Sequence, residues 1–201
     1  YPPEFDTRFI EKLDELFAWR RDVRHFLQSP IDEDLLDEIL DSAALAPSVG
    51  NSQPWRLVSV DSQQKRSQIV QNFEACNREA LAGYSGERAK AYTTLKLEGL
   101  RRAPTHIAVF TDTETGQGHG LGRATTPEML HPSSVCMVMC LLLAARARGV
   151  GIGWVSILEP ESVCRDLNVP TGWELDAYLC LGYPETSELV PELERVGWQS
   201  R

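Results

Sequence analysis

Residues 19–26 read Trp-Arg-Arg-Asp-Val-Arg-His-Phe and place three arginines within five positions. A guanidinium group binds phosphate through parallel hydrogen bonds, so three such groups in one segment can surround a single anion. The carboxylate of Asp22 interrupts the cluster and weakens its attraction for anions, and a role in chemistry is one candidate explanation for its presence. The simpler interpretation is a solvated basic turn with a local ion pair, because runs of charged residues usually face water.

The composition of the whole chain makes this basic cluster an exception. The chain has 201 residues and a net charge of −9, so sequence-independent binding to nucleic acid is not expected. Its length and its 42% hydrophobic content predict a single domain over residues 1–201. The longest apolar run, residues 135–145, falls short of the roughly 18–20 residues that span a bilayer and predicts a buried helix. We therefore expect no membrane partner.

The cysteines indicate the compartment. There are five, an odd number, and none of them forms a C-x-x-C pair. This usage favours reduced thiols in a cytoplasmic protein over a zinc site or a disulfide framework, so no metal is expected.

The spacing of apolar residues predicts the elements of the fold. Helices are expected over residues 5–19, 32–44, 62–81, 133–148 and from 159 onward, and strands over 56–60, 105–110, 152–157 and 175–181. Asp32, Ser62 and one of Ser133 and Ser134 are the expected N-caps. Helices and strands intermingle without strict β-α-β alternation, which favours an α+β fold with a central mixed or antiparallel sheet flanked by helices.

The loop at residues 46–55, Ala-Pro-Ser-Val-Gly-Asn-Ser-Gln-Pro-Trp, is the second candidate for a binding site. Its hydroxyl and amide groups can offer donors and acceptors to a planar polar ligand. A turn that satisfies its own hydrogen bonds is the equally simple alternative. Gly153, in the strand predicted over residues 152–157, indicates a place where another group approaches the backbone closely.

Two further segments of the chain contain more than one glycine. Residues 116–122 read Gly-Gln-Gly-His-Gly-Leu-Gly, which has the wrong spacing for a dinucleotide-binding turn and no helix directly after it. Residues 83–102 are polar, partly helical and punctuated by Gly83 and Gly86, so they can form either a mobile lid or an ordinary surface helix.

Four motifs taken together resemble the nitroreductase superfamily of FMN enzymes. They are Arg20-Arg21-Asp22-Val23-Arg24, residues 47–55, Gly151-Ile152-Gly153-Trp154 and Gly182-Tyr183-Pro184. Their order and spacing match over nearly the whole chain. The resemblance implies a nitroreductase-like fold and an intertwined homodimer that binds FMN at the subunit interface.

The resemblance also implies which residues contact the flavin. Arg20 and Arg24 would contact its phosphate and ring edge, and Asn51 would face the isoalloxazine ring. The full set of expected contacts is Arg20, Arg21, Asp22, Val23, Arg24, Ser48, Asn51, Gln53, Leu97, Gly153, Trp154 and Ser156. Residues 83–102, which include Leu97, would close over the ring and exclude water.

One departure from the general pattern narrows the expected activity. Nitroreductases usually have serine where this chain has Asp22. Asp22, together with Ser156 and residues 83–88, 118–123 and 191–195, resembles the subfamily of 5,6-dimethylbenzimidazole synthases. That subfamily consumes its flavin: reduced FMN and O2 give 5,6-dimethylbenzimidazole, the lower ligand of vitamin B12, and erythrose 4-phosphate. The resemblance implies that this chain depends on NAD(P)H only indirectly, through a separate flavin reductase that supplies the reduced FMN.

These motifs lead to a hypothesis about catalysis. Asp22 would be the general acid/base near the ribityl chain, kept ionised by neighbouring arginines and made more basic by burial. Ser156 would offer a hydroxyl to the flavin, although a strand serine bonded to backbone is the alternative. Two other functions stay open at this point: an NAD(P)H-dependent FMN nitroreductase or quinone reductase, and a non-catalytic flavin-binding protein.

Overall fold

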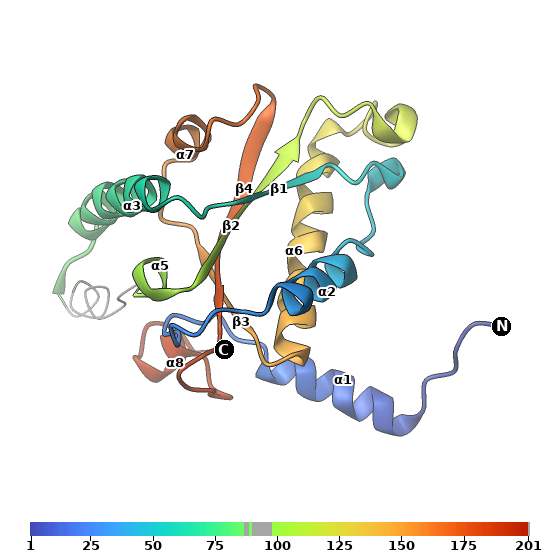
Figure 1. Cartoon of the computed structure of the whole chain (residues 1–201), viewed down its shortest axis with the longest axis horizontal. Coiled ribbons are helices and arrows are strands. Elements are labelled where there is room, and N and C mark those ends of the chain that lie inside the picture. Colours follow the sequence, from blue (N-terminus) through green and yellow to red (C-terminus); the bar gives the residue numbers. More distant parts are fainter. Residues whose placement is uncertain (87–88, 90–97, 201) are drawn as a thin grey trace.

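The fold is organised around a four-stranded antiparallel sheet. The computed structural model describes residues 1–86, 89 and 98–200. The strands are β1 (Trp55–Ser59), β2 (Thr105–Asp112), β3 (Gly151–Val155) and β4 (Trp173–Gly182), in the spatial order β1-β2-β4-β3. Helices cover both faces of this sheet (Figure 1). The predicted α+β class is confirmed, and the sheet in the described part of the chain is the antiparallel alternative.

One face of the sheet is covered by α2 (Glu33–Ala43) and α6 (Leu130–Ala147). The buried side of α6 supplies Met137, Val138 and Leu141 to this core. By length and composition, α6 with the turn before it could cross a membrane. Half of that stretch is buried inside the fold, however, as in the core helix of a soluble protein. The prediction of a buried helix over residues 135–145 is therefore confirmed.

The opposite face is covered by α3 (Gln63–Ala82) and α7 (Pro160–Leu167). Phe26, which follows the arginine segment, is fully buried in this second core and forms an isolated bridge with Pro184. The arginine segment therefore runs directly into the hydrophobic core, which limits its freedom to move.

Two of the predicted helix caps are confirmed. The Asp32 carboxylate accepts hydrogen bonds from the first turn of α2, and the Ser62 hydroxyl accepts one from Lys65 N. The predicted cap at Ser133 or Ser134 is wrong, because α6 begins at Leu130 and both serines are buried inside it. A short 3-10 turn ahead of α6 extends it toward the N-terminus, and the two hydroxyls bond to other groups.

The remaining elements are α1 and several short turns. Helix α1 (Thr7–Trp19) lies at the edge of the molecule and buries none of its residues in the single chain (Figure 1). The short elements are η1 (Val49–Asn51), α5 (Gly99–Arg102), η2 (Gln117–Gly120), η3 (Pro127–Met129) and α8 (Glu192–Arg195).

Candidate active site

The segment around Asp22 lies along strand β3. Asp22 forms a parallel bridge with Ile152, and Val23 N donates a hydrogen bond to Ile152 O at 3.0 Å. The glycines of β3 make this contact possible: a Cβ on Gly153 would lie 2.2 Å from Val23 O, and one on Gly151 would lie 2.7 Å from Val23 Cγ2. The close backbone approach predicted at Gly153 is therefore the approach of the arginine segment itself.

Asp22 is held by contacts to both of its carboxylate oxygens. Oδ1 accepts a hydrogen bond from Trp154 N at 2.7 Å, and Oδ2 lies 3.4 Å from Arg24 Nε. The side chain is still 40% exposed, although its oxygens are directed toward protein groups. The pKa of Asp22 is raised, mainly because the surrounding protein removes water from the carboxyl group. The Trp154 N–H and the Arg24 and Arg20 charges oppose this rise.

Arg24 carries an unsatisfied hydrogen-bonding group. Its side chain is only 12% exposed, and its Nε lies between Asp22 Oδ2 and Glu192 Oε2, at 3.4 and 3.6 Å. Its Nη1 is buried and has no hydrogen-bond partner in the described part of the chain. A buried donor without a partner costs free energy, so this atom is suited to an anionic acceptor that arrives from outside. The phosphate of FMN is such an acceptor, and the residues present fit it.

Arg21 is turned toward the C-terminal tail. Its Nε donates a hydrogen bond to Leu189 O at 2.8 Å, and its Nη1 donates one to Arg20 O. Farther along, Glu185 N donates to His25 O at 3.1 Å, which fixes the start of the same tail. The tail therefore closes one side of the arginine cluster.

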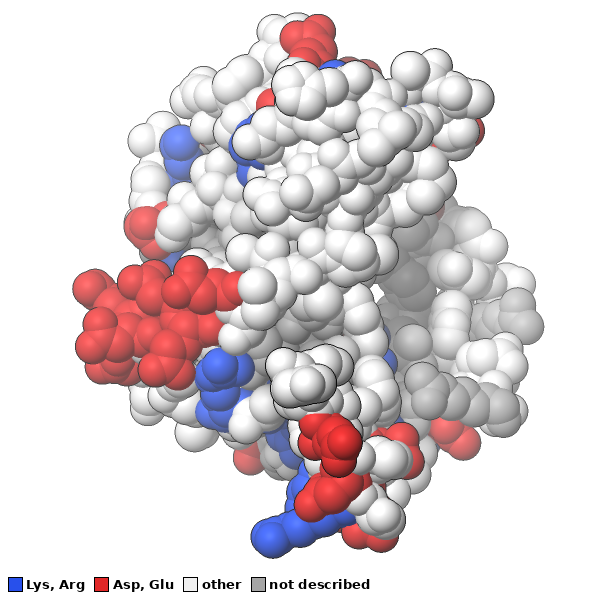
Figure 2. Space-filling view, turned by 90° about the vertical axis from the view of Figure 1, so that its right-hand side faces the viewer, with Lys and Arg blue, Asp and Glu red and all other residues white. Residues whose placement is uncertain are grey.

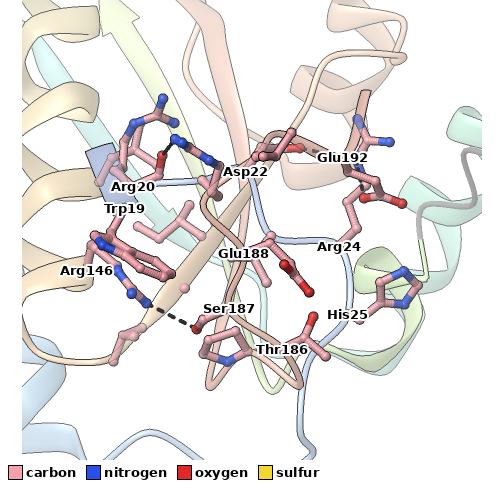
Figure 3. Close-up of a pocket in the computed structure, with 18 of the residues that line it drawn as sticks. Trp19, Arg20, Asp22, Arg24, His25, Arg146, Thr186, Ser187, Glu188 and Glu192 are labelled. Atoms are coloured by element: carbon pink, nitrogen blue, oxygen red, sulfur yellow. Dashed lines mark hydrogen bonds and ion pairs between the residues drawn. The ribbon is translucent and has the colours of Figure 1, made fainter. Parts of the chain in front are cut away.

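Together these groups enclose a small pocket, which we call the arginine pocket (Figure 3). Its wall includes Trp19, Arg146 from α6 and tail residues 186–188. Arg146 Cζ lies 5.8 Å from the centre of the Trp19 ring, and Arg146 Nη1 donates to Ser187 Oγ at 3.4 Å. The pocket encloses about 60 Å³. Ligand sites of cofactor size are several times larger, so this pocket by itself offers space for a phosphate-sized group but not for a whole flavin.

The loop at residues 48–53 is separate from the arginine pocket. Gly50, Asn51 and Gln53 have φ values of 57°, 53° and 43°, so three of its residues adopt the left-handed conformation. The loop holds this shape through its backbone: Ser48 Oγ accepts from Gln53 N, and Val49 N donates to Ser133 Oγ, both at 3.0 Å. The predicted flavin contacts of Ser48, Asn51 and Gln53 therefore do not join Arg20–Arg24 within one chain.

The other predicted residues fall into three groups. Trp154 and Gly153 adjoin Asp22, as described above. Ser156 is an exposed residue directly after β3, outside the wall of the arginine pocket. Leu97 and half of the lid predicted over residues 83–102 lie outside the described residues.

Several residues of the pocket wall were not among the predicted site residues, and Arg146 and Glu192 are the two that matter most for its charge. Arg146 is a single basic residue near the end of an apolar helix, and Glu192 belongs to an acidic tail. The basic residue inside an apolar stripe was a usable signal for Arg146. Glu192 lies within residues 191–195, which belong to the subfamily pattern, but nothing in that pattern links it to the arginine segment.

Comparisons with known proteins show the family of this chain. A family model described as the nitroreductase family matches residues 17–183. The chain is 55% identical over 199 residues to the 5,6-dimethylbenzimidazole synthase of Rhodospirillum rubrum, covering 99% of this chain and 94% of that protein. It is 46% identical to the 5,6-dimethylbenzimidazole synthase of Rhodobacter capsulatus, covering 97% of this chain and 94% of that protein.

Solved structures share the fold. An iodotyrosine deiodinase bound to FMN and 3-iodo-L-tyrosine superposes with a TM-score of 0.73 at 24% identity, covering 88% of this chain and 91% of that one. A nitroreductase family protein from Clostridium novyi NT gives a TM-score of 0.66 at 21% identity, covering 86% and 84%. At these identities the likeness shows the architecture, and the sequence comparisons supply the relationship. The chain belongs to the nitroreductase family.

Proposed function

We propose that this chain converts reduced FMN and O2 into 5,6-dimethylbenzimidazole, the lower ligand of vitamin B12, and erythrose 4-phosphate. The observation that carries the proposal is the carboxylate of Asp22, which is held beside Arg24 by the Trp154 N–H. A flavin reductase that keeps its cofactor intact has no evident use for an acid/base group at this position. The 46–55% identity to two 5,6-dimethylbenzimidazole synthases supports the same reaction.

The arginines would position the substrate. Reduced FMN would supply the carbon atoms and electrons, and O2 would be the oxidant. The buried Nη1 of Arg24 is available for the phosphate, with Arg20 close by on the wall of the pocket. Fixing the phosphate fixes one end of the ribityl chain, which makes its fragmentation a positioned, intramolecular process.

Asp22 would exchange the protons that the fragmentation requires. Its raised pKa brings the carboxyl group closer to the pH at which a general acid/base works well. Ser156, the residue that follows β3, would be a second group that touches the flavin. The segment over residues 83–102, including Leu97, would exclude water from the site.

We further propose that two chains form a homodimer whose sites contain residues from both. The arginine pocket is too small for FMN, and the loop at residues 48–53 does not contribute to it. Figure 2 shows a broad face whose central and upper part carries few charged side chains, with a compact acidic patch at its left edge and mixed acidic and basic side chains at the bottom. Large apolar residues are exposed on α1 and α6, including Phe9, Phe17 and Met139, and a second chain would cover them.

The reaction also implies a partner enzyme and a reducing compartment. Reduced flavin has to be delivered, and no nicotinamide-binding motif is evident in the sequence, so a separate NAD(P)H-dependent flavin reductase is the proposed source. The five cysteines are free thiols, which suits a reducing cytoplasm.

The test is direct. Purified protein is mixed with anaerobically reduced FMN, oxygen is admitted, and 5,6-dimethylbenzimidazole is assayed by chromatography and mass. The expected result is product formation with loss of FMN. Recovery of intact FMN would contradict the proposal, and steady oxidation of NAD(P)H with a nitroaromatic would indicate a nitroreductase instead.

A further inference from the structure

The arginine pocket contains a carboxylate that anion binding does not require. Glu192, on the short helix α8, places its Oε2 3.6 Å from Arg24 Nε (Figure 3). The Glu192 side chain is 26% exposed and Arg24 is 12% exposed, so this contact differs from an ordinary ion pair on an open surface. A second negative charge at this position weakens the binding of a phosphate group.

The position of Glu192 is set by contacts elsewhere in the tail. The tail is attached through Arg21 to Leu189 O, and through an ion pair of 2.9 Å between Arg102 and Glu185. Glu192 therefore reaches Arg24 because the tail as a whole is held there, and the contact does not depend on one flexible side chain.

Glu192 and Asp22 compete for the same N–H group. The Nε of Arg24 carries one hydrogen, which can be directed fully at only one of the two carboxylates. The other groups facing Asp22 are the Arg20 charge on its own segment, the Trp154 N–H on β3 and the buried Cys180 thiol on β4. Glu192 adds a negative charge to these surroundings, because it lies 3.6 Å from the same Arg24 Nε that Asp22 contacts. The other carboxylate of the pocket wall, Glu188, pairs with Arg195 instead.

We propose that Glu192 is a positioning residue that sets the proton affinity of Asp22 and the strength of phosphate binding by sharing Arg24. This inference rests on the proposed function. Both effects of Glu192 on Asp22 have the same sign. Its negative charge disfavours the ionised form of Asp22, and its hold on Arg24 removes part of the positive charge that favours that form. Glu192 thereby keeps Asp22 protonatable at a moderate cost in affinity for flavin.

The experiment compares Glu192→Gln with Glu194→Gln. Both variants remove one charge from α8, but Glu194 is not part of the pocket wall. Oxidised FMN is titrated against each protein, and binding is followed by quenching of flavin fluorescence. Glu192→Gln is expected to bind FMN about three- to tenfold more tightly than the wild type, because a like charge has been removed from the phosphate site. Glu194→Gln is expected to match the wild type.

The second readout is the pH dependence of product formation. Loss of Glu192 leaves Asp22 with a more positive environment, so its pKa falls. The limb of the rate profile that reports Asp22 is expected to move by about 0.5–1 pH unit toward lower pH in Glu192→Gln. Glu192→Asp, which restores the charge, is expected to return the limb toward its wild-type position.

The outcomes separate the two proposals. Weaker or unchanged FMN binding in Glu192→Gln, or an unmoved pH limb, would overturn the role of Glu192. If the wild type made no product, the proposed reaction would fail instead. The affinity comparison needs no turnover, so it would still decide whether Glu192 opposes the binding of flavin.

Discussion

The arginine pocket and the loop at residues 48–53 were both expected to contact the flavin, but they are prepared in different ways. The pocket is built from charged side chains that converge from the end of α1, from α6 and from the tail, and it leaves Arg24 Nη1 without a partner. The loop is built from backbone conformation, with three residues in the left-handed region and Asn51 exposed. One chain thus holds a small pocket lined by arginines and, apart from it, a loop with a preformed backbone shape.

The two regions therefore differ in what each can contribute to a flavin site. Charged groups that bind phosphate and move protons need close packing, which a single chain can supply. A planar ring needs a shaped surface on its other side, and the loop can provide that surface only to a ligand that reaches it from elsewhere. A second copy of the chain is the simplest way to bring the two regions together.

The largest expected effect concerns Asp22, because its carboxylate is the proposed acid/base group. Asp22→Asn keeps the size of the side chain and can still accept from Trp154 N, but it cannot exchange a proton in the same way. General acid/base catalysis typically contributes factors of about 100 to 10,000, so product formation is expected to fall at least about 100-fold. The measurement is the initial rate of 5,6-dimethylbenzimidazole formation from reduced FMN.

Asp37→Asn is the matched control, because Asp37 is exposed on α2 and does not line the pocket. It should leave the rate unchanged. FMN should bind Asp22→Asn at least as tightly as the wild type, since a negative charge has been removed near the phosphate site. A variant that made product at full rate would exclude Asp22 as the acid/base group.

The second prediction tests whether the two regions meet across a dimer. Arg24→Ala damages the pocket and Asn51→Ala damages the loop, and each variant alone is expected to lose most of its activity. If each site joins the pocket of one chain to the loop of the other, a mixed dimer has one intact site. Random mixing makes about half of the dimers mixed, and each mixed dimer has one intact site out of two. About a quarter of wild-type activity should therefore be restored. Co-refolding the two variants and measuring the rate provides the test.

A mixture no more active than the average of its parents would show that pocket and loop act within one chain, or that the loop is not part of the site. The idea that the pocket of one chain and the loop of the other form one site would then be wrong. Sedimentation of the mixture would verify that subunits had exchanged.

What the sequence could predict follows the same division. Residues 20–24 could be proposed as one site because contiguous residues carry their pattern, and the close approach predicted at Gly153 is confirmed. The caps at Asp32 and Ser62 were correct because a cap depends on local hydrogen bonds. Glu192 and Arg146 could not be placed, since only tertiary packing brings the tail and α6 to the arginine segment. The cap predicted at Ser133 or Ser134 failed because a 3-10 turn lengthens α6, which no local rule excludes.

The third prediction concerns the backbone that carries Asp22. A Cβ on Gly153 would lie 2.2 Å from Val23 O, so Gly153→Ala has to push the arginine segment away from β3. Overpacking of this kind costs about 1–3 kcal/mol of unfolding free energy. FMN affinity is expected to fall by about tenfold, which corresponds to a further loss of about 1.4 kcal/mol in binding.

Gly116→Ala is the control for this change, because a Cβ there meets no atom within 4 Å. Its denaturation midpoint and FMN affinity should equal those of the wild type. Equal behaviour of the two variants would mean that the arginine segment does not depend on its contact with β3.

The smallest expected effect is in the loop. Ser133 Oγ accepts a hydrogen bond from Val49 N at 3.0 Å and donates one to Met129 O at 2.7 Å. Ser133→Ala leaves the Val49 N–H without its acceptor, which should lower the free energy of unfolding by about 1 kcal/mol. Ser67→Ala is a matched control, because Ser67 Oγ donates to Gln63 O in the same helical manner without supporting a loop.

The kinetics of Ser133→Ala distinguish the loop from the pocket. A loosened loop should raise the KM for reduced FMN a few-fold and leave kcat almost unchanged, since the groups that move protons lie in the arginine pocket. The loss from Asp22→Asn should appear in kcat instead. If Ser133→Ala reduced kcat as strongly as KM rose, the loop would take part in the chemistry itself. The proposed separation between a loop that binds the flavin ring and a pocket that supplies the acid/base group would then be wrong.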